Sequence, residues 1–171
     1  MGMLIKLSGA FAPLGAQAEF HFQTTADALD AAPENAVLAG EIAVSGTCVN
    51  TGRSYRVEGA VRVLRSFVCD RCLGTFSQPQ AYPFGEDFVR YREGDPQEDG
   101  VERFTDEAID IAPLVRDTIL TAQPLRNLCR DDCRGLCPRC GADLNRGDCG
   151  CDRRSIDPRL AALANLLKRD D

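Results

Sequence analysis

The sequence predicts an α+β protein: an N-terminal antiparallel β meander with a packing helix, then a small cysteine-rich segment and a C-terminal helix. Three observations support this prediction. Residues 1 to about 90 alternate short apolar stretches with Gly, Pro and Asn, which is typical of antiparallel strands joined by turns. Six of the nine cysteines lie between Cys129 and Cys151. Two apolar stripes at helical spacing follow the predicted strands.

Apolar alternation predicts five strands, Leu4 to Ser8, Glu19 to Thr24, Val37 to Cys48, Tyr55 to Val68 and Phe76 to Val89. The sequence Asn50-Thr51-Gly52 is a tight-turn signal and indicates a hairpin between the third and fourth strands. In the fourth strand, valines alternate with charged residues such as Arg56 and Glu58, so one face of the sheet should be solvated. A half-open barrel or a sandwich fits this pattern, and a structural β domain without a site of its own is its simplest interpretation.

Two helices are expected after the strands. Residues Tyr91 to Asp110 are polar and acidic, which predicts a solvated loop. Asp110 can then cap a helix whose apolar stripe ends before Pro124, formed by Ile111, Leu114, Val115, Ile119 and Ala122. Asp157-Pro158 begins a second helix, whose stripe is Leu160, Leu163, Leu166 and Leu167. We therefore expect a β-rich domain over residues 1–125 and a cysteine-rich segment with its helix over residues 126–171.

Composition narrows the functional classes. The net charge is −6, 27% of residues are charged and 44% are apolar, which fits a folded soluble protein. No apolar run approaches the roughly 20 residues that span a bilayer, and no basic region precedes an apolar stretch at the N-terminus, so we expect a cytoplasmic protein without membrane contact. There is no P-loop, dinucleotide fingerprint or nucleophile elbow, and no small-molecule substrate is evident.

The cysteines have the spacing of metal ligands, since disulfides rarely persist in a reducing cytoplasm. Cys-x-x-Cys turns present two thiolates to one zinc ion, and the chain has two of them, at Cys69/Cys72 and Cys137/Cys140. Eight clustered cysteines make two sets of four, which predicts two closed structural zinc sites, the second of them ribbon-like. The expected ligand sets are Cys69, Cys72, Cys129 and Cys133, and Cys137, Cys140, Cys149 and Cys151.

Three alternatives to two structural zinc sites are open: a single zinc site, a catalytic zinc site and a thiol oxidoreductase. A single site could be built from Cys133, Cys137, Cys140 and Cys149, which would leave Cys69 and Cys72 as a free or redox-active pair. A catalytic zinc site usually employs His, but the single histidine, His21, lies far from every cysteine pair in sequence. A thiol oxidoreductase would need its Cys-x-x-Cys at a helix N-terminus, whereas Cys69 follows a predicted strand.

Several ordered motifs resemble those of the YceD family. They are Cys69-Asp-Arg-Cys-Leu-Gly-Thr-Phe76, Ile109-Asp-Ile, the run from Leu128 to Asn145, and Ile156-Asp-Pro-Arg-Leu-Ala161. The resemblance covers about Val61 to Leu167. It implies a non-enzymatic factor that supports the accumulation or processing of large-subunit (23S) ribosomal RNA and assembly of the large ribosomal subunit in bacteria and plastids.

Two binding partners are open under this interpretation. Precursor large-subunit RNA could contact the locally basic cysteine-rich segment through Arg126, Arg130, Arg134, Arg139, Arg146, Arg153 and Arg154. These arginines could equally be paired with the aspartates between them. Alternatively, the protein is an adaptor or chaperone whose acidic stretch, Glu86 to Asp110, receives a basic ribosomal protein.

Overall fold

The computed structural model describes residues 2–7, 13–31, 37–91, 102–105, 107–122 and 124–153. Within these ranges the elements are β1 (Leu4–Lys6), β2 (Gln17–Thr24), α1 (Ala26–Leu29), β3 (Val37–Asn50), β4 (Tyr55–Val68), β5 (Thr75–Arg90), β6 (Glu102–Phe104), β7 (Ala108–Asp110) and α2 (Ala112–Thr121). The chain divides into two compact units. We call residues 1–68 with 75–127 the sheet unit, and residues 69–74 with 128–171 the cysteine unit.

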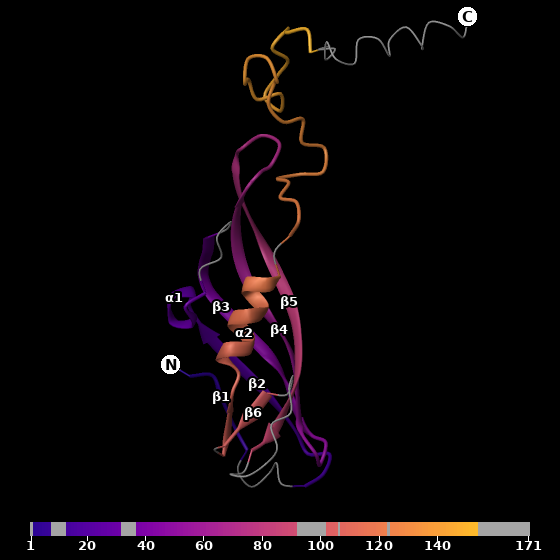
Figure 1. Cartoon of the computed structure of the whole chain (residues 1–171). Coiled ribbons are helices and arrows are strands. Elements are labelled where there is room, and N and C mark those ends of the chain that lie inside the picture. Colours follow the sequence, from indigo (N-terminus) through magenta and orange to yellow (C-terminus); the bar gives the residue numbers. More distant parts are fainter. Residues whose placement is uncertain are drawn as a thin grey trace, which may run out of the picture. The chain divides into compact units, whose positions relative to one another are not determined.

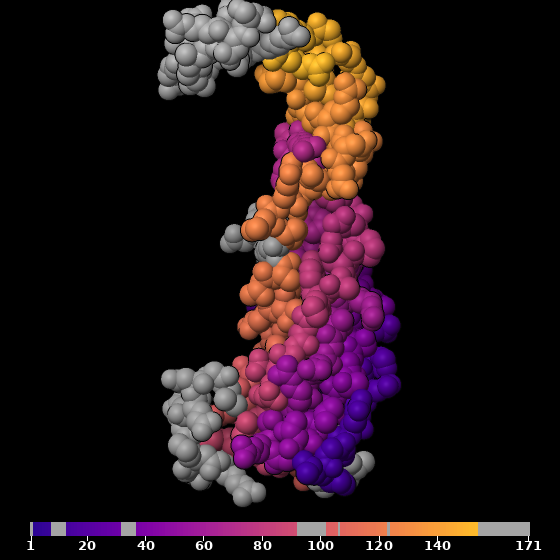
Figure 2. All heavy atoms as spheres, turned by 90° about the vertical axis from the view of Figure 1, so that its right-hand side faces the viewer, coloured from indigo at the N-terminus to yellow at the C-terminus, as the bar shows by residue number. Residues whose placement is uncertain are grey.

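The sheet unit contains a five-stranded sheet in the order β2-β3-β4-β5-β6 (Figure 1). The first four strands form the predicted antiparallel meander, and β6 joins β5 in parallel. In Figure 2 the indigo, purple and magenta atoms of this unit form neighbouring bands of colour on the visible face. A separate antiparallel pair, β1 and β7, contributes Ile5 and Ile109 to the same hydrophobic core. The expected α+β class is therefore confirmed.

The acidic segment from Tyr91 to Asp110 is not a loop throughout, which corrects the prediction. It contains two short strands, β6 and β7, and each buries one apolar residue in the core. Phe104 lies on β6, and Ile109 lies on β7 with its side chain fully buried. Strands of three residues carry too short an alternation to stand out among acidic neighbours. Residues 92–101 and 106 of this segment lie outside the described residues.

Helix α2 packs against β4 and β5, as the apolar stripe predicts (Figure 1). Ile111, Val115 and Ile119 are fully buried along that stripe. The backbone N–H of Ala112 donates to Asp110 Oδ1 at 2.9 Å, so Asp110 satisfies a free donor at the start of the helix. None of the helices in the described ranges is long and apolar enough to cross a bilayer.

Two glycines allow aromatic rings to lie flat on the buried face of the sheet. Across four strands, Phe20 pairs with Gly46, Gly46 with Gly59, and Gly59 with Phe84. The two phenyl rings stack over the glycines with their centroids 6.5 Å apart. A Cβ at Gly46 would lie 2.6 Å from Phe20 Cζ, and one at Gly59 would lie 2.7 Å from Phe84 Cζ. Only glycine leaves room for this packing.

A buried arginine connects β4 to the end of α2. Arg65 is fully buried, and its Nη1 donates to the Tyr82 hydroxyl at 2.8 Å and to the Ala122 carbonyl at 3.0 Å. Its guanidinium also lies 5.5 Å from the centroid of the Phe67 ring. Ala122 is the C-cap of α2, where the helix dipole favours a cation. Arg65 therefore fixes the helix on the sheet.

The cysteine unit has irregular backbone in its described residues. Its hydrogen bonds include a small hairpin in which Leu136 bridges Asp143, Cys137 N–H donates to Ala142 O at 2.8 Å, and Leu144 N–H donates to Gly135 O at 2.9 Å. The hairpin is joined to the 69–74 turn, because Leu136 N–H donates to the Arg71 carbonyl at 3.1 Å. The helix predicted after Asp157-Pro158 lies outside the described residues.

Candidate metal centres

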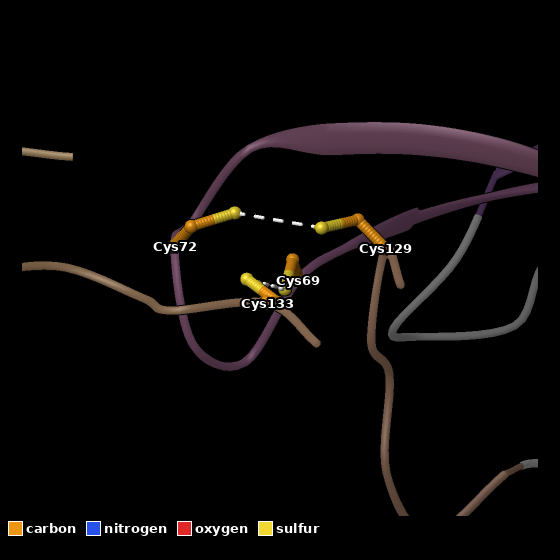
Figure 3. Close-up of side chains that lie close together, drawn as sticks. All are labelled: Cys69, Cys72, Cys129 and Cys133. Carbon is orange, nitrogen blue, oxygen red and sulfur yellow. Dashed lines mark hydrogen bonds between the residues drawn. The ribbon is translucent and has the colours of Figure 1, made fainter. Parts of the chain in front are cut away.

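Four sulfur atoms converge where the β4–β5 turn meets the segment after α2 in sequence. Cys69 and Cys72 come from the turn, while Cys129 and Cys133 come from the later segment. Their side chains point toward one another in Figure 3. The Sγ atoms of Cys69 and Cys133 are 3.8 Å apart, as are those of Cys72 and Cys129. Residues about sixty positions apart thus form one cluster.

A second cluster lies within the small hairpin and the loop that follows it. It consists of Cys137, Cys140, Cys149 and Cys151, and within each cluster all sulfurs lie within 4.8 Å of one another. The structure therefore brings together both sets of four that the cysteine count predicts. It does not form the alternative set of Cys133, Cys137, Cys140 and Cys149, because Cys133 lies in the first cluster.

The sulfur spacing fits tetrahedral coordination. With a metal–sulfur distance of about 2.3 Å, the edges of a regular tetrahedron of sulfurs are about 3.8 Å long. The two sulfur pairs of the first cluster have that separation. A disulfide requires about 2.05 Å, and all nine cysteines are unbridged. Each cluster can therefore hold one thiophilic metal ion with no open position, which is the arrangement of a structural site rather than a catalytic one.

Backbone hydrogen bonds lower the pKa of one thiol in each cluster. Hydrogen bonding from the backbone of Cys129, assisted by that of Cys72 and Arg71, lowers the pKa of Cys69 to about 6. The backbone of Cys140 and then of Arg139 lowers the pKa of Cys137 to about 6.

One other thiol in each cluster ionises less readily than usual. Desolvation and the neighbouring sulfurs raise the pKa of Cys129 to about 12, and bonds with the Cys140 and Cys149 sulfurs raise that of Cys151 to about 12. Four thiolates this close repel one another strongly, so only a cation at the centre can keep them all ionised. The chemistry of both donor sets thus fits a divalent metal.

Asn145 supports the first cluster from outside, and the motif spacing gave no signal for it. Its Nδ2 donates to Cys133 Sγ at 3.5 Å, while its Oδ1 accepts from the Arg134 backbone N–H and from Arg130 Nη2, both at 2.8 Å. Asn145 itself lies in the loop between Cys140 and Cys149. A side chain within the loop of the second cluster therefore orients a sulfur of the first.

Gly135 is a second residue that the motifs did not single out. Its φ of +73° lies in the left-handed region, and an added Cβ would come within 2.9 Å of the Arg71 carbonyl. Arg71 in turn donates through Nη1 to the Cys133 carbonyl at 2.8 Å. The close approach of these two backbones holds the 69–74 turn beside Cys133.

The arginines predicted to contact RNA divide into two groups. Three of them are ion-paired: Arg130 with Asp132 at 3.3 Å, Arg146 with Asp143 at 3.6 Å, and Arg153 with Asp148 at 3.1 Å. Arg126, Arg134 and Arg139 are exposed and make no ion pair with other described residues. Arg126 belongs to the sheet unit, and Arg154 lies outside the described residues. Among the predicted arginines of the cysteine unit, Arg134 and Arg139 are thus the two without an ion pair to another described residue.

The ninth cysteine and the single histidine lie in the sheet unit. Cys48 is fully buried in β3, and burial raises the pKa of its thiol to about 11. His21 is exposed on β2, paired with Ser45 across the β2–β3 ladder. Neither belongs to a sulfur cluster.

Comparison with known proteins gives a family for this combination of sheet and cysteine clusters. The profile described as "Large ribosomal RNA subunit accumulation protein YceD" matches residues 55–167, a range that includes both cysteine clusters. The uncharacterized protein YlbN of Bacillus subtilis is 34% identical over 104 residues, which is 60% of this chain and 60% of YlbN. An uncharacterized protein of Mycobacterium tuberculosis is 41% identical over 71 residues, covering 42% of this chain and 34% of that protein.

A plant relative carries a functional name. The Arabidopsis thaliana protein named large ribosomal RNA subunit accumulation protein YCED homolog 1, chloroplastic, is 25% identical over 157 residues, or 75% of this chain and 49% of the relative. The chain thus spans between about a third and three fifths of the length of these relatives. No solved structure matches it. Because the family profile covers about two thirds of the sequence, from the start of β4 through both sulfur clusters, this chain belongs to the YceD family.

Proposed function

We propose that this protein supports the accumulation of large-subunit ribosomal RNA by binding a precursor of that RNA, in a binding rather than a catalytic role. The observation that carries the proposal is the family match over residues 55–167. Plant relatives are named for large ribosomal RNA subunit accumulation. The cytoplasm, where bacterial ribosomes are assembled, is the corresponding location.

Each sulfur cluster holds one structural zinc ion in this proposal. Four thiolates at tetrahedral spacing favour zinc over the hard cations, which prefer oxygen ligands. A closed S₄ site leaves zinc no position for water, so the ion shapes the unit rather than performing chemistry. Each filled site keeps a charge of −2, because four thiolates outweigh one divalent ion.

RNA contact must be local, because the protein carries −6 before the metal sites are counted and repels a polyanion at long range. Arg134 and Arg139 provide such a contact. Both are exposed, and neither is engaged by an aspartate among the described residues. Arginine binds phosphate through two parallel hydrogen bonds, so two unpaired arginines can hold two phosphates of the backbone.

A binding experiment tests this proposal. Purified zinc-loaded protein is titrated against deproteinised precursor RNA at several salt concentrations. Replacing Arg134 and Arg139 by Ala should weaken binding and reduce the slope of log K against log salt by about 0.7 to 0.9 for each lost phosphate contact. The matched control replaces Arg146 and Arg153, whose charges are already paired. Equal effects of both double variants would contradict a specific arginine contact.

A second candidate is the adaptor for a basic ribosomal protein. The net charge of −6 favours it, because a cationic partner is attracted at long range where RNA is repelled. Pull-down with purified basic ribosomal proteins, beside the same assay with RNA, separates the two functions. If RNA is not retained at low salt while a ribosomal protein is, the adaptor function replaces the proposal. Co-sedimentation of the tagged protein with precursor ribosomal particles is expected in both cases.

A further inference from the structure

The sheet unit has a concave site at the end of the β3–β4 hairpin. Its volume is about 360 Å³, and it is lined by Leu14, Asn50, Gly52, Arg53, Ser54, Tyr55 and Arg90. Five of these seven residues precede the range matched by the family profile. All of them lie in one compact unit.

Local hydrogen bonds hold the hairpin side of this pocket in place. Gly52 N–H donates to Asn50 Oδ1 at 2.8 Å, which fixes the turn at a residue with φ of +89°. Thr51 N–H donates to the Ser54 carbonyl at 2.9 Å and closes the turn. The neighbouring 13–16 turn is bound to the hairpin as well, since Gly15 N–H donates to the Asn50 carbonyl at 2.8 Å. The pocket is therefore formed before any ligand binds.

The charge of the lining is positive. Among the described residues that line it are two arginines, Arg53 and Arg90, and no carboxylate. Neither arginine forms an ion pair with another described residue, and both are exposed. The carboxylate nearest in the hydrogen-bond network, Asp87, already accepts from Arg56 at 2.9 Å and from Ser54 Oγ at 3.1 Å. Two guanidinium groups thus share a preformed hollow, and no carboxylate of the described part of the chain pairs with either.

Aromatic rings fix one of these cations. The guanidinium of Arg90 lies 5.1 Å from the centroid of the Phe104 ring, and Tyr55 packs edge-on against the same ring at 5.7 Å. Such contacts hold Arg90 in place without neutralising its charge. Tyr55 also gives the pocket an aromatic wall. By contrast, the sequence from residue 105 to the end contains no Phe, Tyr or Trp, so the cysteine unit cannot stack bases beside its arginines.

We propose that this pocket binds a phosphate of a single-stranded RNA segment, with Arg53 and Arg90 on the phosphate oxygens and Tyr55 beside the attached nucleoside. The inference rests on the proposed function, because it assigns a second contact for the same RNA. A volume of about 360 Å³ accepts a phosphate with its sugar and base, but a duplex does not enter it. Combined arginine and aromatic contacts are the usual means by which proteins hold single strands without reading sequence.

The test compares two double variants of equal charge. Arg53→Ala with Arg90→Ala removes the pocket cations. Arg62→Ala with Arg116→Ala removes two arginines elsewhere in the sheet unit, the exposed Arg62, bonded to Ser45, and the half-buried Arg116, paired with Asp117. Binding of a labelled, unstructured twelve-nucleotide RNA is measured by fluorescence anisotropy at several salt concentrations. The pocket variant should bind at least about tenfold more weakly, with a salt slope lower by about 0.7 per lost contact, while the control keeps the wild-type affinity. Arg53→Ala alone leaves the Arg90–Phe104 contact intact and covers the case in which the double variant is unstable.

Amide NMR with uridine monophosphate and with inorganic phosphate distinguishes failure of the pocket inference from failure of the proposed function. Shifts at Gly52, Ser54 and Tyr55 with the nucleotide, together with the loss of RNA affinity, support the inference. If wild-type protein binds RNA and the pocket variants bind equally well, the pocket inference is overturned and the proposed function is retained. If the small phosphates shift these amides but RNA does not bind, the RNA assignment is overturned. If neither RNA nor the small phosphates bind, both proposals fail.

Discussion

The two units of this protein bury different kinds of atoms. In the sheet unit, the core consists of aliphatic and aromatic side chains from the five-stranded sheet, the β1–β7 pair and α2. In the described part of the cysteine unit, the buried hydrophobic residues are Cys69, Cys133, Cys137 and Leu144. Three of these four are members of the sulfur clusters. One unit is thus stabilised by apolar burial, while the other depends on its sulfur atoms.

This difference predicts which unit needs a metal ion for folding. Apolar burial stabilises by about 25 cal/mol per Å², so a sheet with a covering helix can fold without a cofactor. The described part of the cysteine unit buries little apolar area and brings like-charged thiolates together. We therefore expect its ordered state to require a cation at each cluster, and the two units should respond differently to the same perturbation.

Removing the metal should have the largest effect, and it should act on one unit. Structural zinc contributes an apparent free energy of about 10 to 16 kcal/mol to the folding of small zinc domains. Treatment with a strong chelator under reducing conditions should therefore abolish amide protection in residues 128–153, while β2 to β5 keep theirs. Hydrogen exchange with mass spectrometry measures both regions in one sample. Elemental analysis should give two zinc ions per chain before treatment, and an ordered cysteine unit in metal-free protein would contradict this comparison.

An added side chain at the centre of the sheet should destabilise the sheet unit and spare the cysteine unit. In Gly46→Val, the new Cβ would overlap the Glu58 carbonyl and lie 2.6 Å from Phe20 Cζ. Overpacking of this kind costs about 1 to 3 kcal/mol, and backbone overlap adds to that cost. The free energy of unfolding of the sheet unit should fall by at least this amount, so its midpoint in denaturant should move to a lower concentration. The zinc content should stay at two. Gly85→Ala is the matched control, since its Cβ would meet the flexible Arg56 guanidinium at 3.1 Å.

Asn145 tests whether the two clusters depend on each other. Asn145→Ala removes the donor to Cys133 Sγ and the acceptor for Arg134 N–H. Loss of a residue that orients a metal ligand typically costs 10- to 100-fold in metal affinity. We therefore expect one of the two zinc ions to be released to a chromogenic chelator at correspondingly lower chelator concentration. Gly147→Ala, in the same loop with open space around its Cβ, should leave both affinities unchanged.

Much of this architecture was predictable because its signals are local. The fourth strand was predicted over Tyr55 to Val68, the range of β4, since its alternation runs without interruption. The cysteine count and Cys-x-x-Cys spacing predicted the membership of both sulfur clusters. The alternation also places position 65 on the buried face, although nothing in the sequence identifies the Tyr82 and Ala122 partners that make an arginine acceptable there.

The features that were missed depend on tertiary neighbours. β7 pairs with β1 from the opposite end of the unit's sequence, so its partner is distant in the chain. β6 pairs with β5 in parallel, which an antiparallel meander does not predict. The four residues of α1 are too few to show a helical period, although Thr25 does cap it through its side chain. Asn145 lies between metal ligands without being one. Its role depends on an N–H···S contact that no spacing rule predicts.

The smallest expected effect is the pH dependence of stability linked to Cys48, the one cysteine that lies in the apolar core rather than in a sulfur cluster. Burial raises the pKa of the Cys48 thiol to about 11, so its folded-state pKa lies above its unfolded value of about 9. The stability linked to this thiol is therefore fully present below pH 9 and is lost as the pH rises toward 11. After chelation at pH 8, a thiol reagent should modify eight cysteines quickly and Cys48 only as the sheet unit unfolds. Cys48→Ala should reduce the fall in unfolding free energy between pH 9 and 11, and rapid modification of Cys48 in folded protein would show that the core admits the reagent.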